Sequence, residues 1–154
     1  MLGRGKADGD NGTRALCTRV SRETSSSATG CEESSRARGT IVAGGTVRWM
    51  VESELEPHTV TFLGGEEPPD LIEPQMQAGG PPKLVFNPDV VGRVGPEVYS
   101  GTGYANSGAM GADFEEYTGL TTYELTFDTP GEYLYYCALH GSPTMGMRAK
   151  VTVT

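Results

Sequence analysis

Short stretches in which apolar and polar residues alternate are the feature that most limits the fold of this chain. Such stretches run over residues 47–51, 58–62, 122–127, 133–137 and 147–154. Alternation with a period of two is typical of half-buried β-strands. No stretch shows the 3.6-residue apolar period of a convincing amphipathic helix. The pattern therefore predicts an all-β sandwich.

Residues 1–39 differ in composition from the rest of the chain. They are rich in Ser, Gly, Arg and Thr and hold seven of the 12 Lys and Arg residues, whereas residues 40–154 hold 15 of the 20 Asp and Glu residues. A segment with isolated apolar residues and no period cannot bury enough surface to offset its ordering entropy. We expect residues 1–39 to be a disordered or non-native segment and residues 40–154 to form the domain.

The charge balance excludes one class of partner. The net charge is −8, and a nucleic-acid-binding protein needs a basic face to neutralise phosphates. An acidic domain instead favours cationic partners. The chain also has no apolar stretch long enough for a transmembrane helix and no secretory signal at its start, so we expect no membrane span.

Residues 63–122 are the least regular part of the expected domain, with many Gly and Pro residues. The apolar pieces at 84–86 and 90–91 predict minor strands or a single helical turn. A connection of this length inside one domain usually has local structure of its own or carries function.

The residues that carry chemistry surround one cysteine. Cys137 is followed three positions later by His140, one of only two histidines, and the other histidine, His58, begins a predicted strand. A methionine follows at Met145 or Met147. Two imidazoles, a thiolate and a weak thioether are the donor set of a blue-copper site. A Cys at a strand end, a His in the next loop and a Met on the next strand would bring three donors to one hairpin tip.

Each of these residues has an ordinary interpretation when taken alone. A lone His is more often a polar surface residue, and a lone Cys is more often a small buried apolar residue. Those interpretations leave unexplained why both histidines fall where a site around Cys137 needs them. Of the three cysteines, Cys17 and Cys31 could form a disulfide, but nothing around them predicts structure.

Four segments carry a family resemblance. Residues 131–140, 147–153, 44–49 and 57–62 resemble the plastocyanin/pseudoazurin group of cupredoxins, and the resemblance covers residues 40–62 and 104–154. It implies a cupredoxin-like Greek-key β-sandwich with a long irregular insert and one copper ion. It also implies single-electron transfer in the periplasm or outside the cell. We expect a monomer whose redox partner has a basic docking surface.

The chain departs from that family in two places away from the axial ligand. Family members usually begin with an additional strand, and residues 1–39 give no convincing version of it. They also often have Asn after the first His and Ser or Thr after the Cys, which locks the two ligand loops together. Thr59 and Ala138 occupy those positions here, so we expect the lock to be absent or altered.

The axial ligand has two candidates. Met145 has the plastocyanin spacing, with four residues between it and His140, whereas Met147 has the family's register with the closing strand. A loop can lengthen freely while a strand register is tied to the core. We therefore predict His58, Cys137, His140 and Met147 as the copper ligands.

Four function classes compete. We expect an electron carrier rather than an enzyme, because multicopper enzymes need His-x-His pairs and a binuclear copper site needs a second cysteine near Cys137. The alternative is a copper storage or delivery module that uses the same ligands. Such modules usually have Met-rich or His-rich runs, which the chain lacks outside residues 140–147. A metal-free binding sandwich would leave the placement of the two histidines unexplained.

Overall fold

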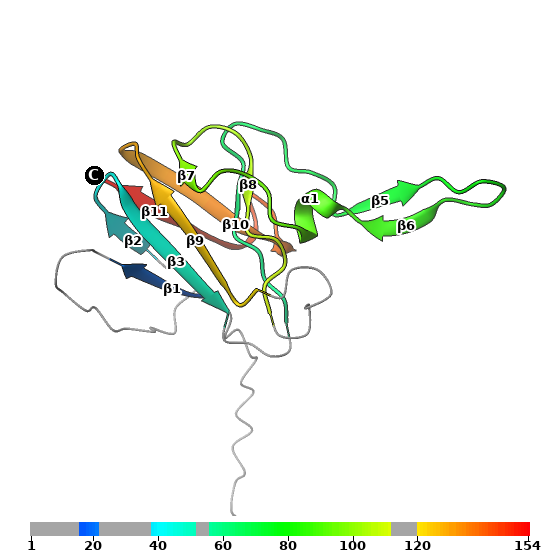
Figure 1. The fold of residues 1–154 in the computed structure, drawn as a ribbon, viewed down its shortest axis with the longest axis horizontal. Coiled ribbons are helices and arrows are strands. Elements are labelled where there is room, and N and C mark those ends of the chain that lie inside the picture. The colour runs from blue at the N-terminus through cyan, green and yellow to red at the C-terminus, as the bar shows by residue number, and fades with distance from the viewer. Residues whose placement is uncertain (1–15, 22–37, 52–55, 112–119) are drawn as a thin grey trace, which may run out of the picture.

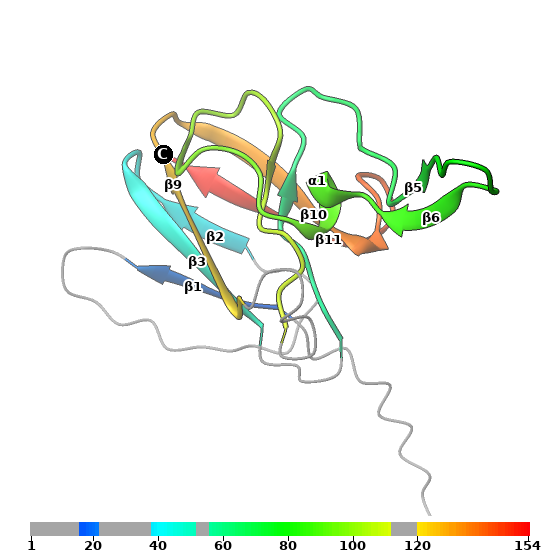
Figure 2. The same cartoon turned by 45° about the vertical axis from the view of Figure 1, so that its right-hand side comes forward.

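The computed structural model describes residues 16–21, 38–51, 56–111 and 120–154, which form a β-sandwich with one short helix (Figures 1 and 2). The prediction of an all-β sandwich is confirmed. Its elements are β1 (Leu16–Ser21), β2 (Arg38–Ile41), β3 (Gly45–Val51), β4 (Thr61–Phe62), β5 (Ile72–Gln75), β6 (Lys83–Phe86), α1 (Pro88–Val91), β7 (Val98–Tyr99), β8 (Ala105–Asn106), β9 (Thr122–Phe127), β10 (Gly131–Gly141) and β11 (Gly146–Val153).

Two sheets make up the sandwich. The first has four strands in the order β1-β3-β9-β7, and the second has five in the order β2-β11-β10-β4-β8. Most neighbours are antiparallel, but β2 runs parallel to β11 and β7 runs parallel to β9. Strands β10 and β11 therefore lie inside the second sheet, where neighbouring strands hold them on both sides.

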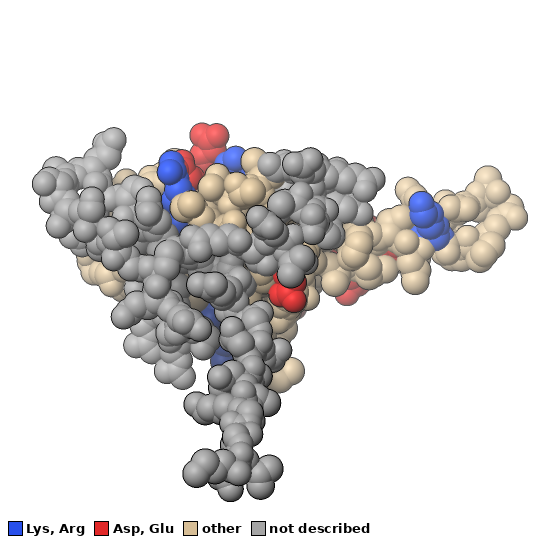
Figure 3. Space-filling view, turned by 90° about the horizontal axis from the view of Figure 1, so that it is seen from below, with Lys and Arg blue, Asp and Glu red and all other residues tan. Residues whose placement is uncertain are grey.

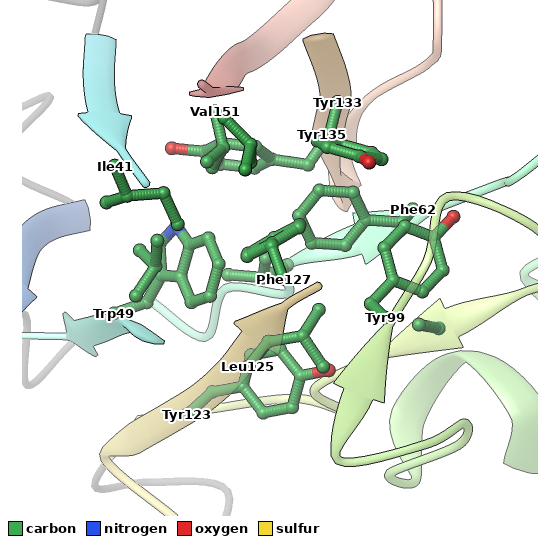
Figure 4. Close-up of a cluster of buried hydrophobic side chains, with 14 of the residues drawn as sticks. Ile41, Trp49, Phe62, Tyr99, Tyr123, Leu125, Phe127, Tyr133, Tyr135 and Val151 are labelled. Atoms are coloured by element: carbon green, nitrogen blue, oxygen red, sulfur yellow. The ribbon is translucent and has the colours of Figure 1, made fainter. Parts of the chain in front are cut away.

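The alternating residues of the predicted strands build the core between the sheets. Along β3, Val47, Trp49 and Val51 are buried while Arg48 is exposed, and β9 buries every second residue in the same way. The Trp49 ring lies 5.5 Å from the Tyr135 ring of the opposite sheet and 5.9 Å from the Phe62 ring (Figure 4). This aromatic packing joins the two sheets and fixes the strands that carry the candidate site.

Two stretches of residues 1–39, the segment that we expect to be disordered or non-native, are described as strands. Strand β1 pairs with β3 over six residues at the edge of the first sheet. Strand β2 begins at Arg38 and pairs with β11 at the edge of the second sheet. Each sheet therefore has an edge strand that the sequence did not reveal. The remainder of 1–39, including Cys31, lies outside the described residues.

The long insert also contains structure. Strands β5 and β6 form a two-stranded sheet of their own, and Asn87 caps the short helix α1, with its side chain accepting a hydrogen bond from the backbone N–H of Asp89 at 2.9 Å. The apolar pieces predicted at 84–86 and 90–91 are thus the end of a strand and a helical turn. No helix in the described part of the chain could span a membrane.

Candidate metal centre

Cys137 and His140 lie in an irregular part of strand β10. The pairing of β10 with β11 is regular up to Tyr136 opposite Arg148 and resumes with Gly141 opposite Gly146. Between these pairs β10 has four residues, from Cys137 to His140, whereas β11 has only Met147. A bulge of this kind turns side chains away from the strand's regular alternation. It lets two donors three residues apart face the same point.

His58 reaches the centre from the segment just before β4, where it forms an isolated bridge with Met110 rather than beginning a strand as predicted. Its backbone N–H donates to the Met110 carbonyl at 2.9 Å, and its carbonyl accepts from the Met110 N–H at 2.8 Å. The side chain of His58 is 1% exposed and that of Met110 is fully buried. The imidazole is therefore held on a fixed backbone and cannot swing into solvent.

The three predicted donors come together. The Cys137 Sγ lies 3.8 Å from the His58 Nδ1 and 3.4 Å from the His140 Nδ1, and all three atoms lie within 4.8 Å of one another. Around a transition metal with sulfur at about 2.3 Å and nitrogen at about 2.0 Å, a sulfur and a nitrogen donor 120° apart are separated by about 3.7 Å. The donor set and its two sulfur–nitrogen distances therefore fit one bound ion. His140 is exposed, while the other two side chains are buried.

The electrostatics of the centre favour metal binding. Burial, and then the nearby His140, lower the pKa of His58 to about 4, although Glu56 acts in the opposite direction. His58 is therefore a neutral imidazole at pH 7 with a lone pair to donate. Its Nε2 atom is buried without a hydrogen-bond partner among the described residues. The Thr59 backbone N–H donates to the Cys137 Sγ, 3.4 Å away, and so orients the sulfur.

A hydroxyl group links the two ligand segments. The Ala138 N–H donates to the Thr59 Oγ1 at 2.8 Å, and the Thr59 and Thr61 hydroxyls lie 3.0 Å apart. Thr61 in turn donates to the Asn106 Oδ1 at 2.9 Å. Since that oxygen only accepts, Thr59 must donate to Thr61. The lock between the ligand loops is thus altered rather than absent, and every hydroxyl in it is satisfied.

Asn106 extends this network to the insert. Its fully buried amide nitrogen donates to the carbonyls of Asp89, Val90 and Gly92, at 3.0, 2.8 and 3.1 Å. Nothing in the sequence assigned Asn106 a contact. The alternation over residues 58–62 puts Thr59 and Thr61 on the face opposite Val60 and Phe62, and that face is buried as well. Only the unusual clustering of small polar residues beside apolar ones could have indicated the network.

The two candidate methionines differ in position. Met147 is half-buried and is the single β11 residue opposite the bulge that holds Cys137 and His140. Met145 is 73% exposed and lies in the loop beyond the Gly141–Gly146 pair.

The C-terminal part of the chain is similar to a known protein family. The profile of copper-binding proteins of the plastocyanin/azurin family matches residues 97–154. No curated protein and no solved structure matches the chain. The matched segment includes Cys137, His140 and both methionines, and His58 lies outside it. The predicted cupredoxin resemblance and the copper cofactor are confirmed.

Proposed function

We propose that this cupredoxin-like, copper-binding protein carries single electrons. The observation that supports the proposal is the convergence of two imidazoles and one thiol, of which only the His140 ring is exposed. One exposed ligand edge beside buried donors gives a partner close approach to the metal without exposing the thiolate. The ligands we propose are His58, Cys137, His140 and Met147.

The protein's own residues would set the geometry of the site. Bound copper would supply a one-electron couple between Cu(I) and Cu(II). The fixed backbone of His58 and the bulge of β10 would hold the donors in place whether or not the metal is oxidised. The Thr59 N–H would stabilise the sulfur charge, and the buried setting of Cys137 would exclude water from it.

Met147 is the axial ligand we propose. The backbone register supports Met147, because this residue lies opposite the bulge of β10. The high exposure of Met145 argues against that residue, since an axial sulfur must face inward. A weak axial thioether mainly tunes the reduction potential of such a site. The argument from strand register in the sequence points to the same residue.

The proposed function is tested by the colour of the copper-loaded protein. Adding Cu(II) should give an intense sulfur-to-copper charge-transfer band at the red end of the visible spectrum, and a mild reductant should bleach it. Cys137→Ser should abolish the band, because a hydroxyl cannot replace the thiolate donor. Cys17→Ser is the matched control and should keep it. A Cys137→Ser protein with the full band would contradict the proposal.

Two further features of the proposal follow from the family. Cupredoxins usually work in the periplasm or outside the cell, and their members are electron carriers rather than enzymes, so we propose both for this chain. We also propose that the folded domain includes β1 and β2, and thus begins before residue 40.

A further inference from the structure

The hairpin of β5 and β6, residues 72–86, is here called the arm. Its two strands pair only with each other among the described residues and form a sheet apart from the sandwich. Figures 1 and 2 show it extending from the end of the sandwich where β10 ends, and Figure 3 shows it projecting beyond the rest of the molecule. An isolated hairpin is only marginally stable in water, so the presence of the arm calls for an explanation.

The two faces of the arm differ in polarity. Residues opposite each other in an antiparallel pair share a face, and the pairs alternate between faces. The register pairs Ile72 with Phe86 and Pro74 with Leu84, so these four apolar residues share one face. The other face carries Glu73, Gln75, Lys83 and Val85.

The apolar face is exposed to solvent, as the polar face is. Leu84 is 70% exposed, Ile72 is 41% exposed, and Met76 at the tip is 78% exposed. Half of the eight large apolar side chains that are exposed on the described residues lie on the arm. A sheet with one apolar face normally packs that face against the core. Contiguous exposed apolar surface of this kind marks an interaction site.

The root of the arm is attached to the metal centre. The Asn87 N–H donates to the Leu71 carbonyl at 2.9 Å and closes the hairpin, and α1 follows directly. The Asn106 amide holds the carbonyls of α1, and its oxygen accepts from the hydroxyl chain that ends at the Ala138 N–H. An unbroken series of hydrogen bonds therefore positions the arm relative to the ligand segment. A protein docked on the arm would lie at a set distance from His140.

Charge around the arm indicates what would dock there. Glu66, Glu67 and Asp70 are exposed on the segment that leads into the arm, and Glu73 is exposed on its first strand, whereas Lys83 is the basic residue of the arm. None of the four carboxylates has an ion-pair partner among the residues that the structure describes. Two copies of the arm brought together would set these carboxylates against each other. An anionic membrane would be repelled in the same way. A basic protein would be attracted.

We propose that the arm is a docking element for a basic redox protein, one that presents an apolar patch surrounded by Lys and Arg. The proposal rests on the proposed electron-carrier function. The apolar face would bind the patch, the four carboxylates would attract the charges around it, and the rigid root would bring the partner's redox centre toward His140. The small size of the face suits the brief encounters of electron transfer.

The first test is the rate at which a basic c-type cytochrome oxidises the reduced copper protein. Leu84→Ser should lower the second-order rate constant about tenfold, within the range that interface substitutions give. Met76→Ser should lower it as well. Gln75→Ser, on the polar face of the same hairpin, is the matched control and should leave it unchanged. Oxidation by ferricyanide should be equal in all four proteins, because that small ion reaches the exposed His140 without the arm.

The second test does not depend on copper. Carbodiimide, which joins carboxylates to lysines, should cross-link the four acidic residues to the cytochrome, and Leu84→Ser should lower the yield. Equal cytochrome rates and equal yields in all variants would overturn the proposal. So would a dimer, or binding to anionic vesicles, that Leu84→Ser abolishes, since the occupant would then be another copy or a membrane. If the charge-transfer band never appears, the proposed function fails while cross-linking still decides the role of the arm.

Discussion

Thr59 connects the two halves of the candidate centre through a single hydroxyl group. The hydroxyl accepts from Ala138, which follows the proposed ligand Cys137, and donates toward Thr61. The backbone N–H of the same residue points at the sulfur. Thr59, which follows His58, therefore holds the segment around Cys137 in place, although the two are far apart in the sequence. Its side chain can be substituted without changing any of the proposed metal donors.

Thr59→Val removes this hydroxyl and keeps the shape of the side chain. The Ala138 N–H then lacks an acceptor and Thr61 lacks a donor, so the free energy of unfolding of the metal-free protein should fall by about 1–3 kcal/mol. Denaturation in urea measures the fall. Thr121→Val makes the same chemical change at an exposed position and should have little effect. Equal stabilities for both variants would show that the hydroxyl chain contributes nothing to the domain.

The axial ligand gives a second prediction. Met147→Leu should raise the reduction potential and keep most of the colour, because the axial bond is weak and tunes the site. Met145→Leu should change the potential much less. Voltammetry of the two copper-loaded variants measures both values. The reverse order would assign the axial position to Met145.

The donors were predictable from sequence and the hydroxyl chain was not, for a physical reason. A thiol and an imidazole are rare groups with few uses, so Cys137, His140 and His58 indicate metal binding by their chemistry alone. Threonine hydroxyls and asparagine amides, by contrast, have many uses in proteins. Their role here depends on contacts between residues 45 to 79 positions apart, which no local pattern records.

At the scale of elements, strands β1 and β2 show the limit of composition as a guide. Residues 16–21 and 38–39 lie among Ser, Gly and Arg residues, and the apolar residues of 16–21 do not alternate with polar ones. Their strand structure comes from β3 and β11, which offer unpaired backbone groups at the sheet edges. By contrast, residues 122–127 alternate so strongly that the sequence predicted β9 with its observed bounds.

Deletion of residues 1–39 tests the two edge strands. It removes β1 and the first half of β2, so the free energy of unfolding should fall by several kcal/mol, since each backbone hydrogen bond contributes about 1 kcal/mol net. Thermal unfolding followed by circular dichroism measures the loss. Deletion of residues 1–15 leaves every described strand in place and serves as the control. A 40–154 protein as stable as the full chain would mean that the edge strands are dispensable.

At the scale of the whole molecule, charge and exposure divide the surface by role. Residues 40–154 carry five basic and 15 acidic residues, so the domain attracts cationic proteins from a distance. Beside the exposed His140 lie the half-buried Leu139 and Pro143 and the exposed Met145, with no charge among them. Long-range attraction and close approach to the metal thus belong to different parts of the surface.

A charge placed beside the ligand edge should interfere with docking. Leu139→Lys should slow electron transfer to a basic c-type cytochrome about tenfold without changing the copper spectrum, because it repels the partner where the two surfaces meet. Stopped-flow kinetics measure the rate, and rising ionic strength should slow the unmodified protein. Leu134→Lys, on the same strand and 70% exposed, is the control. A rate indifferent to Leu139→Lys and to salt would move the electron exit elsewhere, with Tyr136 as the next candidate.

The turn between β10 and β11 is closed on itself. Gly141 pairs with Gly146, the Ser142 N–H donates to the Met145 carbonyl at 2.7 Å, and the Ser142 hydroxyl accepts from the Met145 N–H at 3.1 Å. The register that sets Met147 opposite the bulge is fixed below this turn, by the regular pairs that end at Tyr136 and Arg148. Residues could therefore be gained or lost among 142–145 during evolution while the donors kept their places. A change in the length of this turn would therefore alter the surface that partners contact. The arrangement of the donors around the metal would stay the same.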